Sequence, residues 1–295
     1  MLSIIKWTGA KRFQAPVIVQ QIPDNINTYF EPFLGGGSVL GEYLNCLESG
    51  KKKCNNIVCC DTNEDLIAIW NIIKDDYMSL INEYRKLYEG FKNLDYDHKL
   101  KKQYYYDIRE EYNQLRRENS KDKRRYIIFY WLMRNCFNGL IRYNKYGDFN
   151  ASCHYSRNGM QPEKIEKIFE EWNILLNKYD VQLFCCSYND LPFPYNIIQK
   201  DDLVYCDPPY MNTGSLYDYD KIDYNVFFEW LKKLPCKYLL SFDGFSGDTD
   251  NRYFDIQKEI YDKIEYINSG TSSFKRLVKG KLDEVYDSLY IKEAK

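Results

Sequence analysis

The sequence predicts an α/β protein that has a mainly parallel sheet and a helical insertion. Short apolar runs such as residues 57–60 and 203–206 are bounded by polar and turn residues, as expected for strands buried on both faces. Helical patterns alternate with such runs before residue 72 and after residue 160, and this alternation is typical of a parallel sheet. We therefore predict a sheet domain formed by residues 1–71 and 160–295, and a mainly helical domain formed by residues 72–159.

Length and composition limit the class of protein. The chain has 295 residues, enough for one α/β domain with an inserted module, and no apolar run reaches the ~18 residues of a membrane span. The N-terminus is too short and polar for a signal peptide, so the expected location is the cytoplasm. A net charge of −2 argues against a uniformly basic nucleic-acid binder but permits a local basic face. Ten cysteines without a CxxC spacing and only two histidines predict no metal site.

The first elements follow from local patterns. A short strand at residues 27–31 leads into a glycine loop and then a helix, for which Ser38 is the predicted N-cap. Residues 57–60 form the next predicted strand, and Asn63 is the predicted cap of the helix that follows it.

The second half repeats this alternation. Pro162 lies in the first turn of a strongly amphipathic helix that ends near residue 179. Predicted strands follow at 181–187, 203–206 and 237–243, with a helix at 224–234 between the last two. The segments 263–270 and 284–293 are expected to close the sheet as an antiparallel pair.

Two features at predicted strand ends indicate a cofactor site. The loop "FEPFLGGGSV", residues 30–39, lets the backbone approach a ligand closely and opens a helix N-terminus. Asp61 follows the next strand, about where an acid binds ribose hydroxyls in a dinucleotide fold. A tight turn and a helix-capping acid are the structural alternatives. Together the two features predict a cofactor that contains adenosine.

A third feature, "DPPY" at residues 207–210, follows the strand 203–206. Two prolines prevent the strand from continuing and fix the backbone. The Asp207 carboxylate and a proline carbonyl are two acceptors suited to an –NH₂ group, and the Tyr210 ring can stack on a planar heterocycle. A strand-ending turn is the structural alternative.

Four motifs in one order carry a family resemblance: "KWTGAK" at residues 6–11, "EPFLGGGSV", "FNGLIRYNKYGDFN" at residues 137–150, and "DPPY". The chain resembles the Dam-like DNA adenine-N6 methyltransferases, the alpha group of the D12 class. This resemblance implies a Rossmann-like S-adenosylmethionine-dependent methyltransferase sheet with an inserted, mainly helical DNA-recognition domain. It implies catalytic roles for Asp207, Pro208, Pro209 and Tyr210.

The resemblance also implies binding residues. Contacts to S-adenosylmethionine are expected from Trp7, Lys11, Phe33, Gly35, Gly37, Asp61, Asp190 and Asp207. Asn138, Arg142 and Asn144 fall in the DNA-recognition segment, and the basic run near the C-terminus adds Lys275 and Arg276 as DNA-facing residues.

The implied reaction is methylation of the N6 amino group of an adenine flipped out of double-stranded DNA. Methylation of N4 of cytosine, methylation of a base amino group in RNA, and DNA binding without turnover are the alternatives. The implied partners are duplex DNA and, in a restriction–modification system, a cognate restriction endonuclease. A GATC target does not follow, because "NASCHYS" after residue 149 and "SFDGFSG" after residue 240 differ from close relatives of Dam.

Overall fold

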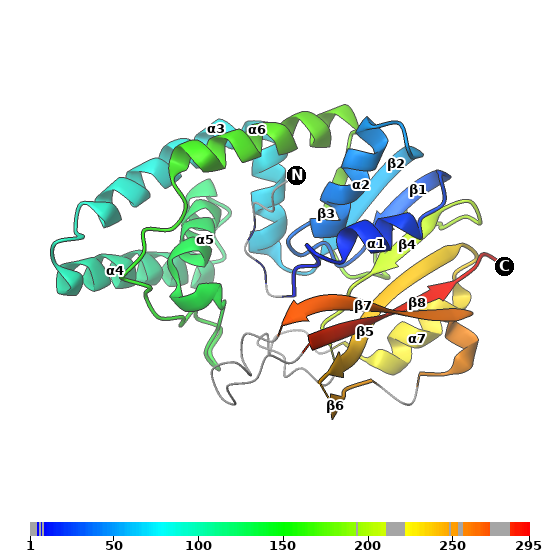
Figure 1. Cartoon of the computed structure of the whole chain (residues 1–295). Helices are drawn as coiled ribbons and strands as arrows, with labels where there is room; N and C mark the ends of the chain where they lie inside the picture. The colour runs from blue at the N-terminus through cyan, green and yellow to red at the C-terminus, as the bar shows by residue number, and fades with distance from the viewer. Residues whose placement is uncertain are drawn as a thin grey trace. The chain divides into compact units, whose positions relative to one another are not determined.

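The computed structural model describes residues 5, 7, 9–192, 194–210, 222–247, 249–252, 256–271 and 284–295. It divides into two compact units, which we call the sheet unit and the helical unit (Figure 1). Of the described residues, 11–62 and those from 184 onward belong to the sheet unit, and the others to the helical unit. This division is based on packing. The functional boundaries expected at residues 72 and 159 remain a prediction.

The sheet is a mixed one in the order β3-β2-β1-β4-β5-β8-β7, with β6 paired to β5. Strand β1 is parallel to β2 and β4, and β4 is parallel to β5. Strand β8 is antiparallel to both β5 and β7, which confirms the predicted antiparallel closure. The strand bounds are β1 Asn25–Glu31, β2 Lys53–Asp61, β3 Gln182–Cys185, β4 Leu203–Cys206, β5 Lys237–Ser246, β6 Thr249–Asp250, β7 Lys263–Thr271 and β8 Glu284–Lys292.

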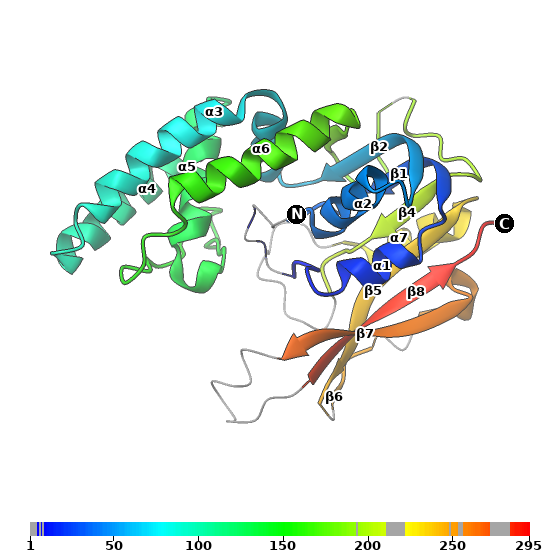
Figure 2. The ribbon, with the colours of Figure 1, turned by 45° about the horizontal axis from the view of Figure 1, so that its top comes forward.

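Helices of the sheet unit cover both faces of its strands. These helices are α1 (Ala15–Gln20), α2 (Ser38–Glu48), α7 (Tyr224–Lys233) and the short η2 (Lys258–Ile260). On β1, Tyr29 stacks on Tyr43 of α2, whereas its neighbour Phe30 belongs to the core cluster that contains Phe227 of α7. Successive residues of a strand point to opposite faces, so α2 and α7 pack on opposite sides. Figure 2 shows α1 and α2 lying together beside β1.

The start of α2 corrects one prediction. Gly37, with φ 64°, occupies the N-cap position in the left-handed region, and Ser38 is the first helical residue. Only glycine adopts this conformation without strain, so the turn into the helix falls on Gly37. Ser38 Oγ is buried and bonds to none of the described residues. The prediction that Ser38 caps the helix is therefore wrong.

The helical unit contains α3 (Glu64–Lys92), α4 (His98–Arg117), α5 (Lys123–Asn135), η1 (Phe137–Gly139) and α6 (Pro162–Lys178). Asn63 caps α3 by accepting a hydrogen bond from the Leu66 N–H at 2.9 Å, and Pro162 opens α6, as predicted. The Trp70 and Trp172 rings, 4.8 Å apart, join α3 to α6. No helix in the described part of the chain has the length and apolar character needed to cross a bilayer.

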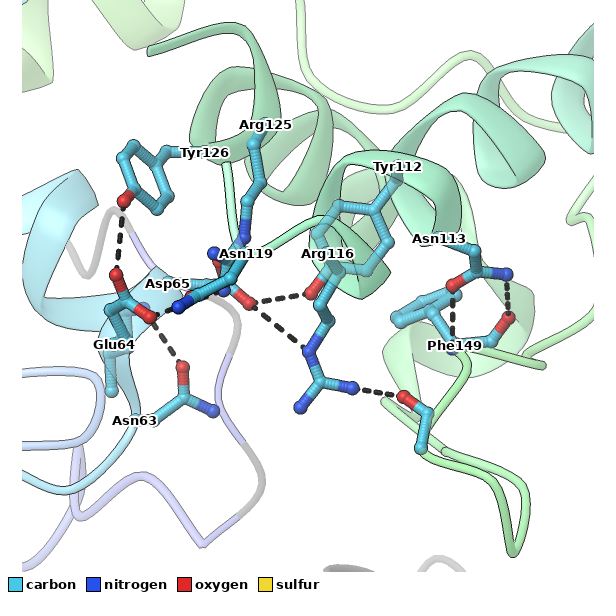
Figure 3. Close-up of polar contacts among 12 residues, drawn as sticks. Asn63, Glu64, Asp65, Tyr112, Asn113, Arg116, Asn119, Arg125, Tyr126 and Phe149 are labelled. Atoms are coloured by element: carbon cyan, nitrogen blue, oxygen red, sulfur yellow. Dashed lines mark hydrogen bonds and ion pairs between the residues drawn. The ribbon is translucent and has the colours of Figure 1, made fainter. Parts of the chain in front are cut away.

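A buried charged network joins α3, α4 and α5 (Figure 3). Asp65 Oδ1 lies 2.7 Å from Nε of Arg125, and both side chains are about 4% exposed. Tyr112 donates a hydrogen bond of 2.6 Å to Asp65 Oδ2, and Arg116 Nε lies 3.8 Å from the same oxygen. The carboxylate is thus satisfied from α4 and α5 at once, which ties the N-terminus of α3 to both helices.

Helix α4 also fixes the segment after η1 (Figure 3). The Asn113 carboxamide donates to the Phe149 carbonyl at 3.1 Å and accepts from the Phe149 N–H at 2.8 Å, as a neighbouring strand would. Arg116 donates to the Gly147 carbonyl. Tyr143 and Phe149 form an antiparallel bridge, so residues 143–149 make a small hairpin that is anchored to α4.

The Arg125→Met variant should lower the stability of the helical unit by about 3–5 kcal/mol, because it removes the nearer of the two guanidinium groups beside the buried Asp65 charge. Lys121→Met removes the exposed partner of Glu64 and should cost less than about 1 kcal/mol. Urea unfolding followed by the fluorescence of the buried Trp70, Trp131 and Trp172 measures both. Equal, small losses in the two variants would contradict this account.

Candidate active site

The candidate site lies in the sheet unit, where the carboxyl ends of its parallel strands meet. Strand β1 is flanked by β2, which follows it in the chain, and by β4, which comes much later, so the strand order reverses beside β1. Ligands of open α/β sheets bind outside the carboxyl ends of the strands at such a switch point. Glu31 ends β1, Asp61 ends β2, and Asp207 directly follows β4.

The glycine loop and Asp61 lie together at the end of β2. Gly35 and Gly37 have φ of 48° and 64°, conformations that favour glycine. The Gly35 N–H donates to Asp61 Oδ2 at 3.0 Å, and the Leu34 N–H donates to the Cys60 carbonyl at 3.0 Å. These bonds hold the loop against the end of β2.

Lys11 brings a buried positive charge to the end of β4. Its side chain is only 6% exposed, and its Nζ lies 2.8 Å from Asp207 Oδ1. The backbone at Lys11 is held in place because the Lys11 carbonyl accepts hydrogen bonds from the N–H groups of Gln14 and Ala15 at the start of α1. An ion pair with so little exposure is screened weakly by solvent.

The electrostatics of Asp207 reflect competing effects. Burial and the nearby Asp287 carboxylate raise the pKa of Asp207, while the Lys11 ammonium and the Tyr210 hydroxyl lower it, and the net result is a pKa of about 6. The carboxylate is therefore ionised at neutral pH and becomes protonated in mildly acidic solution.

Glu31 is more strongly perturbed. Burial and, to a smaller extent, the Asp207 charge raise the pKa of Glu31, the hydrogen bond from the Tyr29 hydroxyl lowers it, and the net result is a pKa of about 8. That hydrogen bond measures 2.8 Å. Glu31 is thus largely protonated in the folded protein at neutral pH.

The Asp-Pro-Pro-Tyr turn presents acceptors and an aromatic ring. The Pro209 carbonyl accepts a hydrogen bond from the Tyr224 hydroxyl. None of the described residues donates to the Pro208 carbonyl. The Tyr210 ring lies 5.8 Å from Phe242, and Lys11 Nζ lies 4.7 Å from its centroid. The turn therefore offers the Asp207 carboxylate and the Pro208 carbonyl side by side.

Three other predicted cofactor residues have different surroundings. Phe33 is partly buried beside Tyr188 and Phe227, with ring centroids 5.8 and 5.7 Å away. Asp190 is exposed and lies in a turn closed by its N–H and the Ser187 carbonyl. Trp7 belongs to the helical unit, where its carbonyl accepts a hydrogen bond from the Ala10 N–H.

The predicted DNA-facing residues lie on the segment anchored by α4. Asn138 is exposed and has a positive φ of 56°. Arg142 is exposed, and its Nε and Nη2 donate to the side chain and carbonyl of Asn150 at 2.8 and 3.2 Å. Asn144 Oδ1 accepts from the N–H groups of Tyr146 and Asp148, so this side chain shapes the hairpin turn. Lys275 and Arg276 lie outside the described residues.

Sequence reasoning missed Glu31, Gln14 and Asp287 as members of the site. Glu31 lies in the motif at residues 30–39, in which binding roles were predicted for Phe33 and the glycines but not for Glu31. Asp287 is an acid in the middle of an otherwise strand-like run, and a charge at such a position is a signal that could have identified it. Nothing in the local pattern singles out Gln14.

The fold and this site together define a class of protein. A doubly wound sheet carries a glycine loop, an acid after the second strand, and an Asp-Pro-Pro-Tyr turn at its switch point. This arrangement is that of a methyltransferase that acts on an amino group.

Comparison with known proteins narrows the class. The model of the family described as D12 class N6 adenine-specific DNA methyltransferase matches residues 7–282. The type II methyltransferase M.MjaIII of Methanocaldococcus jannaschii is 31% identical over 308 residues, covering 97% of this chain and 96% of that protein. The DNA adenine methylase of Vibrio cholerae is 30% identical over 226 residues (76% and 71%), and that of Escherichia coli K12 is 29% identical over 228 residues (76% and 70%).

The chain therefore belongs to the D12 class of N6 adenine-specific DNA methyltransferases. It is a transferase that methylates adenine in DNA and requires a methyl donor. This assignment confirms the predicted family and reaction and does not favour N4 of cytosine or an RNA base.

The Glu31→Gln variant should be more stable than the wild-type protein, and the difference should grow as the pH rises from 5 to 8. A carboxyl group whose pKa is raised on folding loses stabilisation as the pH rises from its unfolded to its folded value. We expect a gain on the order of 1–3 kcal/mol at pH 8 relative to pH 5. Calorimetric melting at both pH values measures it, and Glu259→Gln, which alters an exposed carboxylate, is the control. Differences that stay constant with pH would refute the buried, protonated Glu31.

Proposed function

We propose that this enzyme transfers the methyl group of S-adenosylmethionine to N6 of an adenine that is flipped out of duplex DNA. The reaction site is the carboxyl edge of β1, β2 and β4. The observation that carries the proposal is the pairing of two acceptors at the end of β4: the largely buried Asp207 carboxylate and the Pro208 carbonyl, to which no described residue donates.

The residues at the switch point suit this methyl donor. S-adenosylmethionine would supply an electrophilic methyl group on a positively charged sulfur. Gly35 and Gly37 leave room for close backbone approach, and the buried Ser38 Oγ is a polar group that no described residue satisfies. Asp61 offers a carboxylate for ribose hydroxyls, and Phe33 an apolar wall. In the proposal, the remaining residues that contact S-adenosylmethionine are Trp7, Lys11, Asp190 and Asp207.

The acceptors would activate the amino group of adenine. The lone pair of this nitrogen is delocalised into the ring, so the group is a poor nucleophile. Hydrogen bonds to the Asp207 carboxylate and the Pro208 carbonyl would favour a pyramidal nitrogen. Its lone pair can then attack the methyl group in line, while the methyl–sulfur bond breaks and its electron pair stays on the sulfur of the departing thioether. Positioning supplies most of the acceleration. The proton released from the nitrogen passes to Asp207 or to water.

The Asp-Pro-Pro-Tyr turn also accounts for binding of the flipped base. Tyr210 supplies a ring for stacking, and Pro209, whose carbonyl is held by Tyr224, keeps the turn rigid. Extrusion from the duplex is required because base stacking and pairing bury the target nitrogen.

We further propose that residues 72–159 form the DNA-recognition domain. Support comes from the exposed Arg142, whose guanidinium fork suits the two major-groove acceptors of guanine, and from the exposed Asn138 nearby. Asn144 would act by shaping the hairpin as well as by contact, and Lys275 and Arg276 would add phosphate contacts.

A cognate restriction endonuclease is also part of the proposal. Its support is the likeness over nearly the whole chain to a relative named a type II methyltransferase. An endonuclease whose cleavage of a DNA is blocked by prior treatment with this enzyme would identify such a partner.

Asp207→Ala should lower the rate of methyl transfer by about 100-fold or more, since general acid–base and hydrogen-bonding groups contribute about 10²–10⁴. In the wild-type enzyme, kcat/KM should fall as the pH drops through about 6, because protonation removes the acceptor. Nucleoside mass spectrometry of unmethylated DNA incubated with S-adenosylmethionine measures N6-methyladenine. Asp201→Asn, at an exposed acid before β4, is the control. Full activity of Asp207→Ala would overturn the mechanism.

Arg142→Ala should weaken discrimination between target and altered DNA sites by about 1–3 kcal/mol, or about 10- to 100-fold in relative kcat/KM. Binding of S-adenosylmethionine should not change. Mapping of methylated adenines in genomic DNA first defines the site, and steady-state assays on oligonucleotides that differ at one position then measure discrimination. Lys86→Ala removes an exposed charge from α3 and serves as the control. Unchanged discrimination in Arg142→Ala would contradict a role of Arg142 in sequence recognition.

A further inference from the structure

Asp287, on the last strand of the sheet, is the centre of a polar cluster that reaches the Asp-Pro-Pro-Tyr turn. Its Oδ2 accepts hydrogen bonds from Gln14 Nε2 at 2.6 Å and from the Tyr210 hydroxyl at 3.0 Å. Lys11 Nζ lies 3.9 Å from the same oxygen. Oδ1 accepts a hydrogen bond of 3.2 Å from Ser269 Oγ.

We propose that Asp287 is a positioning residue for methyl transfer: it fixes the ring of Tyr210 and the ammonium of Lys11 in the geometry that the reaction needs. This inference rests on the proposed function of the turn. Asp287 acts through Tyr210 and Lys11 and is not itself an acceptor for the target amino group.

The sheet is irregular on both sides of Asp287. Along β5, the pairing with β8 shifts register between Phe242 and Phe245, opposite Ser288 and Tyr286. Along β7, it shifts between Asn268 and Gly270, opposite Tyr286 and Val285. Bulges redirect side chains and are frequent next to active sites. Here both bulges lie next to the position of Asp287.

Each bulge has a specific residue that supports it. A Cβ atom on Gly244, in the β5 bulge, would lie 1.9 Å from the Tyr286 carbonyl oxygen, so the approach of the two backbones requires glycine. In the β7 bulge, Ser269 Oγ lies 3.0 Å from the Val285 carbonyl oxygen and 3.2 Å from Asp287 Oδ1, so its one hydroxyl hydrogen is shared between these two acceptors. The carboxylate is thus held from β7 while its second oxygen faces Gln14, Tyr210 and Lys11.

The contacts of Asp287 restrict the groups that the turn uses. A hydrogen bond at the phenol end of Tyr210 limits the rotation of the ring, which a flipped base needs in one orientation for stacking. The negative charge of Asp287 also helps to retain the Lys11 ammonium between two carboxylates, 2.8 Å from Asp207. Loss of Asp287 removes the hydrogen bond from the Tyr210 hydroxyl and the second carboxylate near the Lys11 ammonium.

A positioning role predicts an altered pH profile as well as a slower reaction. The groups that act on Asp207 are Lys11, Asp287 and Tyr210, and the buried Tyr205 and Glu31 also lie in its field. Asp287 raises the pKa of Asp207, so neutralising Asp287 should lower that pKa and move the acidic limb of the profile to lower pH.

The test compares Asp287→Asn and Asp287→Ala with the wild-type enzyme in single-turnover methyl transfer to unmethylated DNA. We expect a rate loss of about 10- to 100-fold in both variants, since small misplacements of reacting groups cost up to about 10²-fold. The dissociation constant of S-adenosylmethionine should change by less than about threefold, because the glycine loop keeps its bond to Asp61 and Lys11 still lies beside Asp207. Asp262→Asn, which removes an exposed partner of Lys292, is the control.

A double-mutant cycle separates positioning from a general structural effect. Tyr210→Phe keeps the ring and removes the tether, so Tyr210→Phe combined with Asp287→Asn should react about as slowly as Asp287→Asn alone. Additive losses, or a rate within twofold of wild type for Asp287→Asn, would overturn the proposal. A loss that only parallels weaker S-adenosylmethionine binding and an unshifted pH profile would do the same.

A measurement that does not require catalysis tests the role of Asp287 separately from the proposed function. Nitration of Tyr210 by tetranitromethane, followed by peptide mass spectrometry, should be faster in Asp287→Asn, because Asp287 holds the phenol and raises its pKa. Unchanged nitration overturns the positioning role whether or not the enzyme is active. Absence of N6-methyladenine with the wild-type enzyme would instead overturn the proposed function, while faster nitration would still support the tether.

Discussion

The structure of the site depends on one buried ammonium group shared among carboxylates. Removing a charge from water costs several kcal/mol unless a partner compensates for it. Lys11 supplies that compensation to Asp207 directly and to Asp287 at longer range. Strands β1, β4 and β8 deliver the acids, and the segment before α1 delivers the cation. The turn after β4 can keep an ionised acceptor in a largely buried position only because this ammonium is there.

The charges at this edge of the sheet do not balance. Glu31, Asp207 and Asp287 lie at this edge together with the Lys11 ammonium. Burial, and to a smaller extent the Asp207 charge, raises the pKa of Glu31 to about 8, so the proton that Glu31 keeps at neutral pH lessens the excess of negative charge.

The sequence predicted elements that depend on local rules and failed where distant segments decide. Asn63 and Pro162 were predicted correctly because capping and the first-turn preference of proline involve neighbouring residues only. Ser38 was wrong because the left-handed Gly37 moved the cap by one residue. The glycine loop and the Asp-Pro-Pro-Tyr turn were found because their chemistry is contained in short motifs. Gln14 was missed because no local pattern marks it. The acid at Asp287 within a strand-like run was a local signal, but its partners Gln14 and Tyr210 come from distant segments and are known only from the folded structure.

The helical unit also depends on a buried ion pair, here between a carboxylate and a guanidinium group. Its buried ion pair between Asp65 and Arg125 joins three helices, and Asn113 then fixes the hairpin backbone through both of its amide atoms. Arg142, for which we propose a role in sequence recognition, directly precedes this anchored hairpin, and among the described residues its guanidinium bonds to Asn150 at the surface. Exposed hydrogen bonds of this kind contribute little net stability and exchange readily for other acceptors. In the proposed role, Arg142 would exchange Asn150 for a base edge at small cost, while the anchored hairpin beside it remains in place.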